Sequence, residues 1–274
     1  MSSTFFEIFD QHEGDEIYKW SHYFDIYEKH FSKFRNSKES ITVIEIGVLY
    51  GGSLQMWQKY FGEKATIVGI DIYQECKKYE KDNIKIRIGS QSDENFLKEI
   101  VTEFPKIDLV IDDGSHRVFH QLFSFKYLFP YLRDGGVYLI EDTHSSYWVS
   151  FGGGLKRRGS MIEFSKSIID SLHARYSEQR AFKQDYYTEN VAGIHFYDSI
   201  ICFNKGKTNV PITLKRGNNQ ENRESIYRDV KKSYVYKFSF FVILKINQFL
   251  QFFRLPGFIL DGAINIKLRK KRNL

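Results

Sequence analysis

Apolar runs alternate with amphipathic stretches through residues 41–142 of the chain. The apolar runs are rich in Ile and Val, which is typical of strands buried in a parallel sheet. Strands are predicted at residues 41–48, 66–72 and 84–90 and in the two runs that end in Asp112-Asp113 and Glu141-Asp142. Helices are predicted between them, at residues 50–61, 93–104 and 118–132. Strand–helix alternation with short connections predicts an α/β fold, a doubly wound and mostly parallel sheet of the Rossmann-like type.

Different patterns flank this alternation. Residues 18–34 place aromatic side chains at three- and four-residue steps, which predicts an amphipathic helix that caps the sheet. After the last predicted strand come a polar, glycine-rich loop at 145–160, a helix at 161–176 and an antiparallel edge hairpin at 193–204. The predicted domains are a helical cap at 1–40, a main domain at 41–205, a linker at 206–230 and an aromatic, basic segment at 231–274.

Cysteine usage and the N-terminus indicate the compartment. Cys76 and Cys202 are the two cysteines of the sequence, so a disulfide framework is excluded beyond one bridge,. The first ten residues are acidic where a secretion signal would be basic,. We therefore expect a cytoplasmic protein.

The formal charge of +6 is concentrated at the C-terminal end. Residues 229–274 hold ten Lys/Arg against two Asp, a balance of +8, which leaves −2 for residues 1–228. The main domain is therefore not basic, and we expect no nucleic-acid partner for it.

The basic segment mixes aromatic residues with cations. Lys237, Lys245 and Arg254 interrupt its apolar residues, so a membrane-spanning helix is not expected,. A basic cluster at 267–272 follows. Such a segment suits peripheral contact with an anionic surface, here the inner face of the cytoplasmic membrane. The alternative is packing against another subunit of a homo-oligomer.

A glycine-rich turn, EIGVLYGGS at residues 45–53, joins the first strand to its helix. Gly47 and Gly51 permit close approach of the backbone, and the helix that begins near Ser53 offers free N–H groups to a carboxylate. Asp71, at the end of the second strand, is placed to bind ribose hydroxyls. Neither a dinucleotide fingerprint nor an ATP-binding loop matches this spacing, but the arrangement suits another nucleoside-bearing cofactor.

The most specific pattern in the sequence is DDGSH at residues 112–116, followed by Glu141-Asp142. Carboxylate oxygens are preferred ligands of Mg²⁺, and Asp113, Glu141 and Asp142 would supply them. A cation there would bind and acidify a substrate hydroxyl, and His116 would accept its proton. Because alternate residues of a strand point to opposite faces, we expect Asp112 to face the cofactor or a helix amino-terminus instead.

These motifs resemble those of known enzymes. The glycine turn resembles the first motif of class I S-adenosylmethionine-dependent methyltransferases, and GSQSD at 89–93 resembles the segment that borders adenine in their metal-dependent O-methylating members. The acid–histidine motifs resemble those of the Mg²⁺-dependent macrolide-sugar O-methyltransferases, in which the corresponding residues are three metal ligands and a base. The resemblance covers about residues 17–205 and implies a seven-stranded sheet. The cofactor contacts that it and the turn imply are Glu45, Gly47, Tyr50, Gly51, Ser53, Asp71, Ser90, Gln91 and Asp112.

Segments after residue 143 also resemble bacterial methyltransferases of surface-polysaccharide synthesis. Thr143-His144 departs from the macrolide enzymes, which leaves the acceptor open. His144, Tyr147 and Trp148 are candidate substrate contacts, with a structural hydrogen bond as the alternative for His144. The loop at 147–160, with three cations at 156–158, is either a lid over an anionic acceptor or a solvated loop.

The expected function is transfer of a methyl group from S-adenosylmethionine to a sugar hydroxyl, with Mg²⁺ or another divalent cation. The expected acceptor is a glycan precursor of surface polysaccharide such as O-antigen. Two alternatives remain open. One is a methyltransferase acting on catechol-like or macrolide-sugar natural products, and the other is a non-catalytic cofactor-binding partner of a glycosyltransferase.

Overall fold

The computed structural model describes residues 3–35, 37–177, 182–217 and 234–252. The chain divides into two compact units, residues 1–210 and 211–274. The N-terminal helices and the sheet belong to the first unit. Most of the expected linker and the basic cluster at 267–272 lie outside the described residues.

The first unit is built on a seven-stranded sheet with the order β3-β2-β1-β4-β5-β7-β6. The strands are β1 (Ile41–Ile46), β2 (Ala65–Asp71), β3 (Ile84–Ile88), β4 (Ile107–Asp112), β5 (Leu132–Ile140), β6 (Val191–Phe196) and β7 (Ile201–Lys205). Strands β1 to β5 pair in parallel, whereas β7 runs antiparallel to both β5 and β6. The mostly parallel sheet and its antiparallel edge hairpin confirm the predicted fold class.

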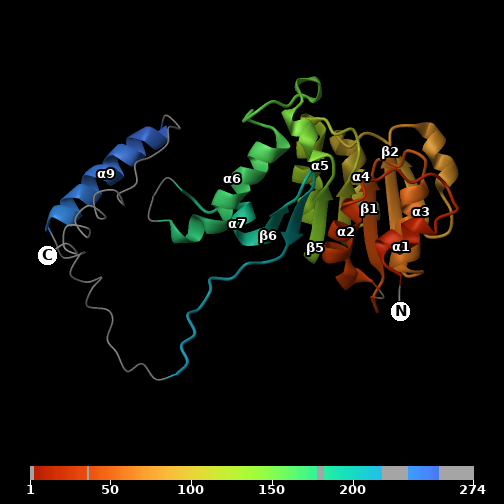
Figure 1. Ribbon diagram of the computed structural model, residues 1–274, viewed down its shortest axis with the longest axis horizontal. Coiled ribbons are helices and arrows are strands. Elements are labelled where there is room, and N and C mark those ends of the chain that lie inside the picture. The colour runs from red at the N-terminus through yellow and green to blue at the C-terminus, as the bar shows by residue number, and fades with distance from the viewer. Residues whose placement is uncertain (1–2, 36, 178–181, 218–233, 253–274) are drawn as a thin grey trace. The chain divides into compact units, whose positions relative to one another are not determined.

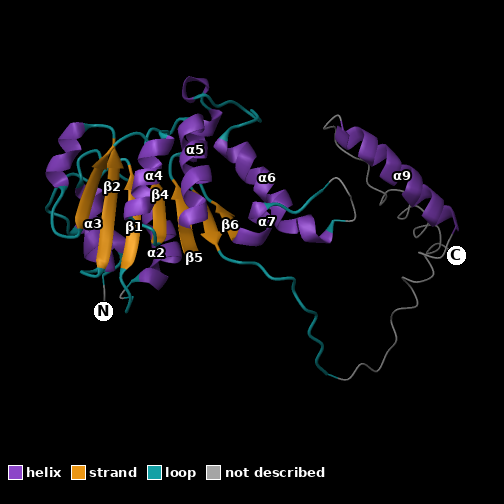
Figure 2. Cartoon of the chain, turned by 180° about the vertical axis from the view of Figure 1, so that it is seen from behind, coloured by secondary structure: helices purple, strands orange, loops and turns teal. Residues whose placement is uncertain are grey.

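Helices cover both faces of the sheet (Figure 2). One apolar core lies between the sheet and α1 (Phe5–Asp10), α2 (Tyr23–Phe31) and α3 (Gly52–Phe61). The other core lies between the sheet and α4 (Glu94–Glu103), α5 (Val118–Leu128) and α6 (Met161–His173). Alternate residues of β1 enter opposite cores, Val43 the first and Ile44 the second,. Because both faces are covered, the strands need apolar residues at successive positions, which is the pattern that predicted them.

Several helices differ from the sequence-based predictions. The aromatic pattern at 18–34 predicted one helix, but α2 begins only at Tyr23, and residues 11–22 cross the sheet edge without helix or strand. This crossing sends Lys19 inward, whereas Trp20 stays 40% exposed. The short helix α7 (Tyr186–Asn190) was not predicted, because its start depends on a local cap in which the Asp185 side chain accepts from Thr188 N,.

The register of the sheet places the polar ends of its strands together. Ile46 of β1 pairs with Asp112 of β4, and Asp112 pairs in turn with Ile140 of β5. The residues that follow these strands therefore emerge side by side at the carboxyl edge, where parallel α/β sheets bind ligands (Figure 1),. These residues are Gly47, Asp113 and Glu141.

In the second unit the structure describes residues 211–217 and helix α9 (Tyr234–Phe252). Phe238 and Phe241 expose more than half of their side-chain surface, and the Lys245 ammonium lies 5.7 Å from the centre of the Phe241 ring. Among the described residues, none of the helices combines the length and apolar character that crossing a membrane requires.

Candidate functional site

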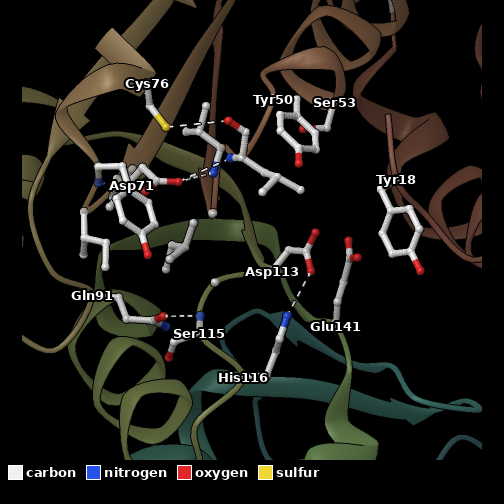
Figure 3. Close-up of a pocket in the computed structure, with 18 of the residues that line it drawn as sticks. Tyr18, Tyr50, Ser53, Asp71, Cys76, Gln91, Asp113, Ser115, His116 and Glu141 are labelled. Atoms are coloured by element: carbon white, nitrogen blue, oxygen red, sulfur yellow. Dashed lines mark hydrogen bonds and ion pairs between the residues drawn. The ribbon is translucent and has the colours of Figure 1, made fainter. Parts of the chain in front are cut away.

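A cavity of about 740 Å³ opens at the carboxyl edge of the sheet. This volume is in the range of small-molecule sites. The glycine-rich turn, the ends of β2 and β3, and the loops after β4 and β5 all contribute to its lining. Asp113, His116 and Glu141 point toward one another on one side of the cavity, whereas Asp71 and Gln91 lie on the other (Figure 3). The predicted cation residues and His116 line this cavity together with six of the predicted cofactor residues, Gly47, Tyr50, Ser53, Asp71, Ser90 and Gln91, whereas Glu45, Gly51 and Asp112 do not line it.

The glycine-rich turn passes directly over the loop that follows β4. Gly47 has φ +94°, and a Cβ atom there would lie 2.2 Å from the backbone oxygen of Asp113. Gly51 has φ +78° and allows no side chain beside the ring of Tyr79. Glycine is therefore required at both positions, and the turn exposes its backbone to the cavity.

Asp71 holds this turn in place. One carboxylate oxygen accepts hydrogen bonds from the backbone N–H groups of Val48 and Leu49, at 2.8 and 3.3 Å. The other accepts from Tyr73 N at 3.0 Å. Asp71 lines the cavity, as the sequence predicted for a ribose contact, but its visible bonds are to the turn itself.

Glu45 and Ser53 connect the first strand to the helix that follows it. The Ser53 hydroxyl donates to Glu45 Oε2 at 2.7 Å, and Glu45 is fully buried. Burial raises the pKa of Glu45, although Lys19 and Ser53 oppose this effect. Ser53 and Tyr50 reach the cavity, and Tyr50 is half exposed there.

Asp112 lies beneath the cavity and does not line it. Its carboxylate accepts from Gln91 Nε2 at 3.0 and 3.2 Å and from the Ser124 hydroxyl at 2.5 Å. Gln91 does line the cavity, as does Ser90, and its Oε1 accepts from Ser115 N at 3.0 Å. Asp112 was predicted on the cofactor side, but the structure gives Gln91 that place and Asp112 the position behind it. The expected divergence of Asp112 and Asp113 is present, since Asp113 turns toward Lys19.

Asp113, His116 and Asp142 form a compact polar group. Each offers one ligand atom within 4.8 Å of the other two, and each side chain is about one-quarter exposed. His116 Nε2 lies 3.5 Å from Asp142 Oδ2 and 3.9 Å from Asp113 Oδ1. The imidazole thus has a basic nitrogen facing the same space as two carboxylates.

The backbone at this group is strained. His116 has φ +53° and Asp142 has φ +52°, values that non-glycine residues rarely adopt,. Leu49 in the glycine-rich turn, with φ +48°, is a third case on the same cavity. Such strain persists where the surrounding structure fixes it, and it concentrates at functional sites.

Glu141 is more deeply buried than its neighbour Asp142, with 1% of its surface exposed. Its carboxylate accepts from the Tyr27 hydroxyl at 2.6 Å and from Lys19 Nζ at 3.0 Å. Burial and the nearby Asp113 raise the pKa of Glu141 well above its ordinary value. Asp142 accepts at Oδ1 from the Tyr23 hydroxyl, also at 2.6 Å. Helix α2 thus supplies one tyrosine to each acid of the pair.

Lys19 brings an ammonium group into the middle of the acids. Its Nζ lies 2.5 Å from Asp113 Oδ2, 3.0 Å from both Glu141 oxygens and 3.5 Å from Glu45 Oε1. Burial alone would lower the pKa of Lys19, but these three carboxylates together hold it well above its ordinary value. The group therefore stays charged.

The charges at the site suit a hard dication. Four carboxylates, of Glu45, Asp113, Glu141 and Asp142, face one ammonium, so ionised groups would leave a formal excess of three negative charges. Uncompensated buried charge is costly. Oxygen donors with partial access to the cavity are what Mg²⁺ prefers, and Asp113 and Asp142 offer them. The residues present therefore fit the predicted cation.

Aromatic side chains continue the cavity wall beyond Asp142. The Trp20 ring lines the cavity and stacks on His144, with ring centres 5.1 Å apart and planes at 11°. Trp148 makes an edge contact with the same imidazole, with its ring centre 4.7 Å from that of His144 and the planes at 70°. His144 also pairs through Nδ1 with the Ser199 hydroxyl. His144, Trp148 and the half-exposed Tyr147 do not line the main cavity themselves.

Sequence analysis gave Lys19, Trp20 and Tyr23 no role at the site. Their segment was predicted as helix, which gave Lys19 no special position. One signal was available. Neither DDGSH nor the Glu141-Asp142 motif includes a Lys or Arg, so the acids needed a cation from elsewhere in the chain,.

Comparison with known proteins finds relatives among the O-methyltransferases. The chain matches no protein-family model. It is 37% identical over 191 residues to the demethylmacrocin O-methyltransferase of Streptomyces fradiae, covering 66% of this chain and 47% of that protein. It is 36% identical over 194 residues to the mycinamicin VI 2''-O-methyltransferase of Micromonospora griseorubida, with the same coverage of 66% and 47%. The chain thus spans about half the length of these relatives.

A solved structure supports the same grouping. The MycE methyltransferase of the mycinamicin biosynthetic pathway, in complex with Mg, S-adenosylhomocysteine and mycinamicin VI, aligns with a TM-score of 0.65 and 32% identity. The alignment covers 77% of this chain and 55% of that one.

Proposed function

Because the chain belongs to the class I S-adenosylmethionine-dependent methyltransferases, we propose that it moves a methyl group from S-adenosylmethionine to a sugar hydroxyl, aided by a divalent cation. The observation that carries this proposal is the meeting of Asp113, His116 and Asp142 beside a glycine-rich turn in one cavity. A cofactor at the turn and a hydroxyl at the acid–histidine group would be neighbours.

The cofactor would lie along the turn. Backbone N–H groups at the start of α3 suit its carboxylate, and Asp71 and Gln91 flank the space for its ribose and adenine,. Glu45, Gly47, Tyr50, Gly51, Ser53 and Ser90 complete the proposed contacts. We place Asp112 behind Gln91, acting through that side chain.

The cation would be held by Asp113 and Asp142, with Glu141 the third proposed ligand. When bound, such a cation polarises a hydroxyl and lowers its pKa. His116 Nε2 faces the same space and would take the hydroxyl proton, while the acceptor oxygen forms its bond to the methyl carbon and the methyl–sulfur bond breaks,. Much of the rate would come from holding the two reactants in line.

The aromatic wall of Trp20, His144 and Trp148 would contact the acceptor. Flat aromatic faces suit the apolar face of a sugar, and Tyr147 lies next to them in the chain. The relatives methylate, by their names, demethylmacrocin and mycinamicin VI, which favours a glycoside as the acceptor class. We propose that the particular glycan is a surface-polysaccharide precursor such as O-antigen, because the segments after residue 143 resemble bacterial methyltransferases of surface-polysaccharide synthesis. A macrolide-type glycoside is the alternative, and the relatives' names favour it.

Membrane contact would bring the enzyme to a lipid-linked acceptor at the inner face of the cytoplasmic membrane. The exposed aromatic side chains of α9 and the nearby Lys245 support this proposal,. Self-association through the same segment, giving a homo-oligomer, is the alternative.

The test of the proposed function is His116→Ala. Loss of the base should lower turnover by about 10²–10⁴-fold. Calorimetric binding of S-adenosylmethionine should stay unchanged, because His116 lies on the acid side of the cavity. The acceptors compared would be a macrolide glycoside and a lipid-linked oligosaccharide.

His173→Ala, an exposed histidine at the end of α6, is the matched control and should leave turnover unaltered. Turnover of His116→Ala equal to that of the unsubstituted enzyme would remove His116 from the mechanism. An absence of S-adenosylmethionine binding by the unsubstituted protein would overturn the proposed function itself.

A further inference from the structure

Lys19 occupies a place that the proposed chemistry does not explain. Its side chain is 2% exposed, yet its ammonium lies among acids that the proposed function assigns to a cation. Within the described residues, the ion pairs of Glu45 and Glu141 are with Lys19 alone. An ammonium group at this position must therefore affect any other cation that binds there.

The backbone holds Lys19 at this place. The preceding residues pass tightly over the start of α3, where a Cβ on Gly52 would lie 2.1 Å from the Asp15 oxygen. Gln55 Nε2 donates to the Asp15 carboxylate at 2.5 Å. The segment that precedes Lys19 is thus held against α3, and the Lys19 ammonium bridges Glu45 within β1, Asp113 after β4 and Glu141 after β5.

The ammonium also uses oxygens that a cation would use. It takes Asp113 Oδ2 and both oxygens of Glu141, which leaves Asp113 Oδ1 and the Asp142 carboxylate facing His116. Affinity for a dication follows the number of charged ligands, and a fixed positive charge a few ångströms away opposes it.

We propose that Lys19 is a positioning residue and internal counter-cation, which holds Asp113 and Glu141 in place and weakens the site's affinity for its dication. The inference rests on the proposed function, since it assumes that a dication binds at these acids. When the four carboxylates are ionised, Lys19 offsets one of their negative charges, so one dication can bind without all of the carboxylate oxygens coordinating it. Coordination positions then remain for substrate oxygens.

The experiment measures Mg²⁺ binding by calorimetry to chelator-treated full-length protein, without acceptor. Lys19→Met removes the charge and keeps much of the side-chain volume. Its dissociation constant for Mg²⁺ should fall by about tenfold or more. Lys19→Arg keeps the charge and should stay within about threefold of the unsubstituted protein. Lys59→Met, on the exposed side of α3, is the matched control.

Thermal unfolding gives a second readout, which remains informative if Lys19→Met folds poorly without Mg²⁺. Without Mg²⁺, Lys19→Met should melt below the unsubstituted protein, because buried acids lose their partner. Saturating Mg²⁺ should raise its melting temperature by more than that of the unsubstituted protein, since tighter binding stabilises more. A variant that folds only when Mg²⁺ is added would be the extreme form of this result.

Two failures can be told apart. If the unsubstituted protein binds no Mg²⁺, the cation in the proposed function is wrong. If it binds Mg²⁺ and Lys19→Met binds it equally or more weakly, the cation stands and the inference about Lys19 is overturned.

Discussion

At Gly47 the backbone of the glycine-rich turn packs against the backbone of the loop that follows β4. Its positive φ and the 2.2 Å approach of the Asp113 oxygen to the position of a Cβ are separate obstacles to any side chain. Asp113 is also a proposed cation ligand. A change at Gly47 would therefore disturb both the glycine-rich turn and the polar group that contains Asp113.

Gly47→Ala tests this coupling. We expect a loss of unfolding free energy of about 3 kcal/mol or more, since backbone strain and a steric clash add. Gly62→Ala is the matched control, because Gly62 has φ +85° but no atom within 4 Å of its Cβ position. It should cost about 1–2 kcal/mol from strain alone. Urea unfolding measures both, and equal losses would show that the contact with Asp113 does not matter.

The positions of some site residues could be predicted from the sequence, and those of others could not. Asp113, His116 and Asp142 could be predicted as neighbours, because they follow adjacent buried strands. Lys19 could not, since its position depends on where residues 11–22 cross the sheet. Asp112 was expected beside the cofactor, but its carboxylate lies behind Gln91, and the sequence pattern does not show that Gln91 would fill the space in front of it.

Helix α2 and the hairpin of β6 and β7 form a contact that the site depends on. Tyr23 and Tyr27 of this helix donate to the acids, and His30, further along it, is 6% exposed against the hairpin. His30 Nε2 lies 2.9 Å from the Tyr197 hydroxyl, and its ring centre is 4.7 Å from that of His195. Burial, with the added effect of His195, Lys29 and Lys33, lowers the pKa of His30 to about 4.

This pKa predicts a pH dependence of stability. Between about pH 6.5 and pH 4 the unfolded chain binds a proton at His30 that the folded protein does not, so the unfolding free energy falls as the pH falls. The contribution is about 2–3 kcal/mol over that window. His30→Gln removes the titrating group and keeps a polar partner for Tyr197. Its unfolding free energy, measured by urea titration at pH 7 and pH 4.5, should fall less than that of the unsubstituted protein, and an equal fall would contradict the assignment.

Among the elements, the strands were the most predictable. Ile and Val at successive positions have one good environment, a sheet covered on both faces, and each of the five parallel strands was found. The start of α2 was not predictable from aromatic spacing, because Trp20 fits the helical step but lies outside the helix. Helix α7 depends on one capping residue and has too few apolar positions to give a pattern.

The whole chain combines a compact unit that holds the cavity with a second unit of different composition. The relatives are matched over about two thirds of this chain and about half of their own length. Similarity therefore bears on the cavity, whereas residues 211–274 need a test of their own.

Flotation with vesicles is that test. The full chain should float with vesicles that contain anionic lipid and less at high salt, because aromatic insertion and electrostatic attraction act together. A chain ending at Val210 should stay at the bottom of the gradient, and neutral vesicles serve as the control. Equal flotation of both chains would exclude the second unit as the anchor. A full chain that stays unbound but sediments as a larger species would favour self-association.

The reach of Lys19 also bears on how the cavity forms. It lies 94 residues before Asp113 and 122 residues before Glu141 in the sequence, so each contact closes a long loop of chain. Closing such a long loop costs conformational entropy, and the contact offsets that cost only when both partners are already held in place. We therefore expect this wall of the cavity, although supplied by an early part of the chain, to be completed late in folding, after β4 and β5 have joined the sheet.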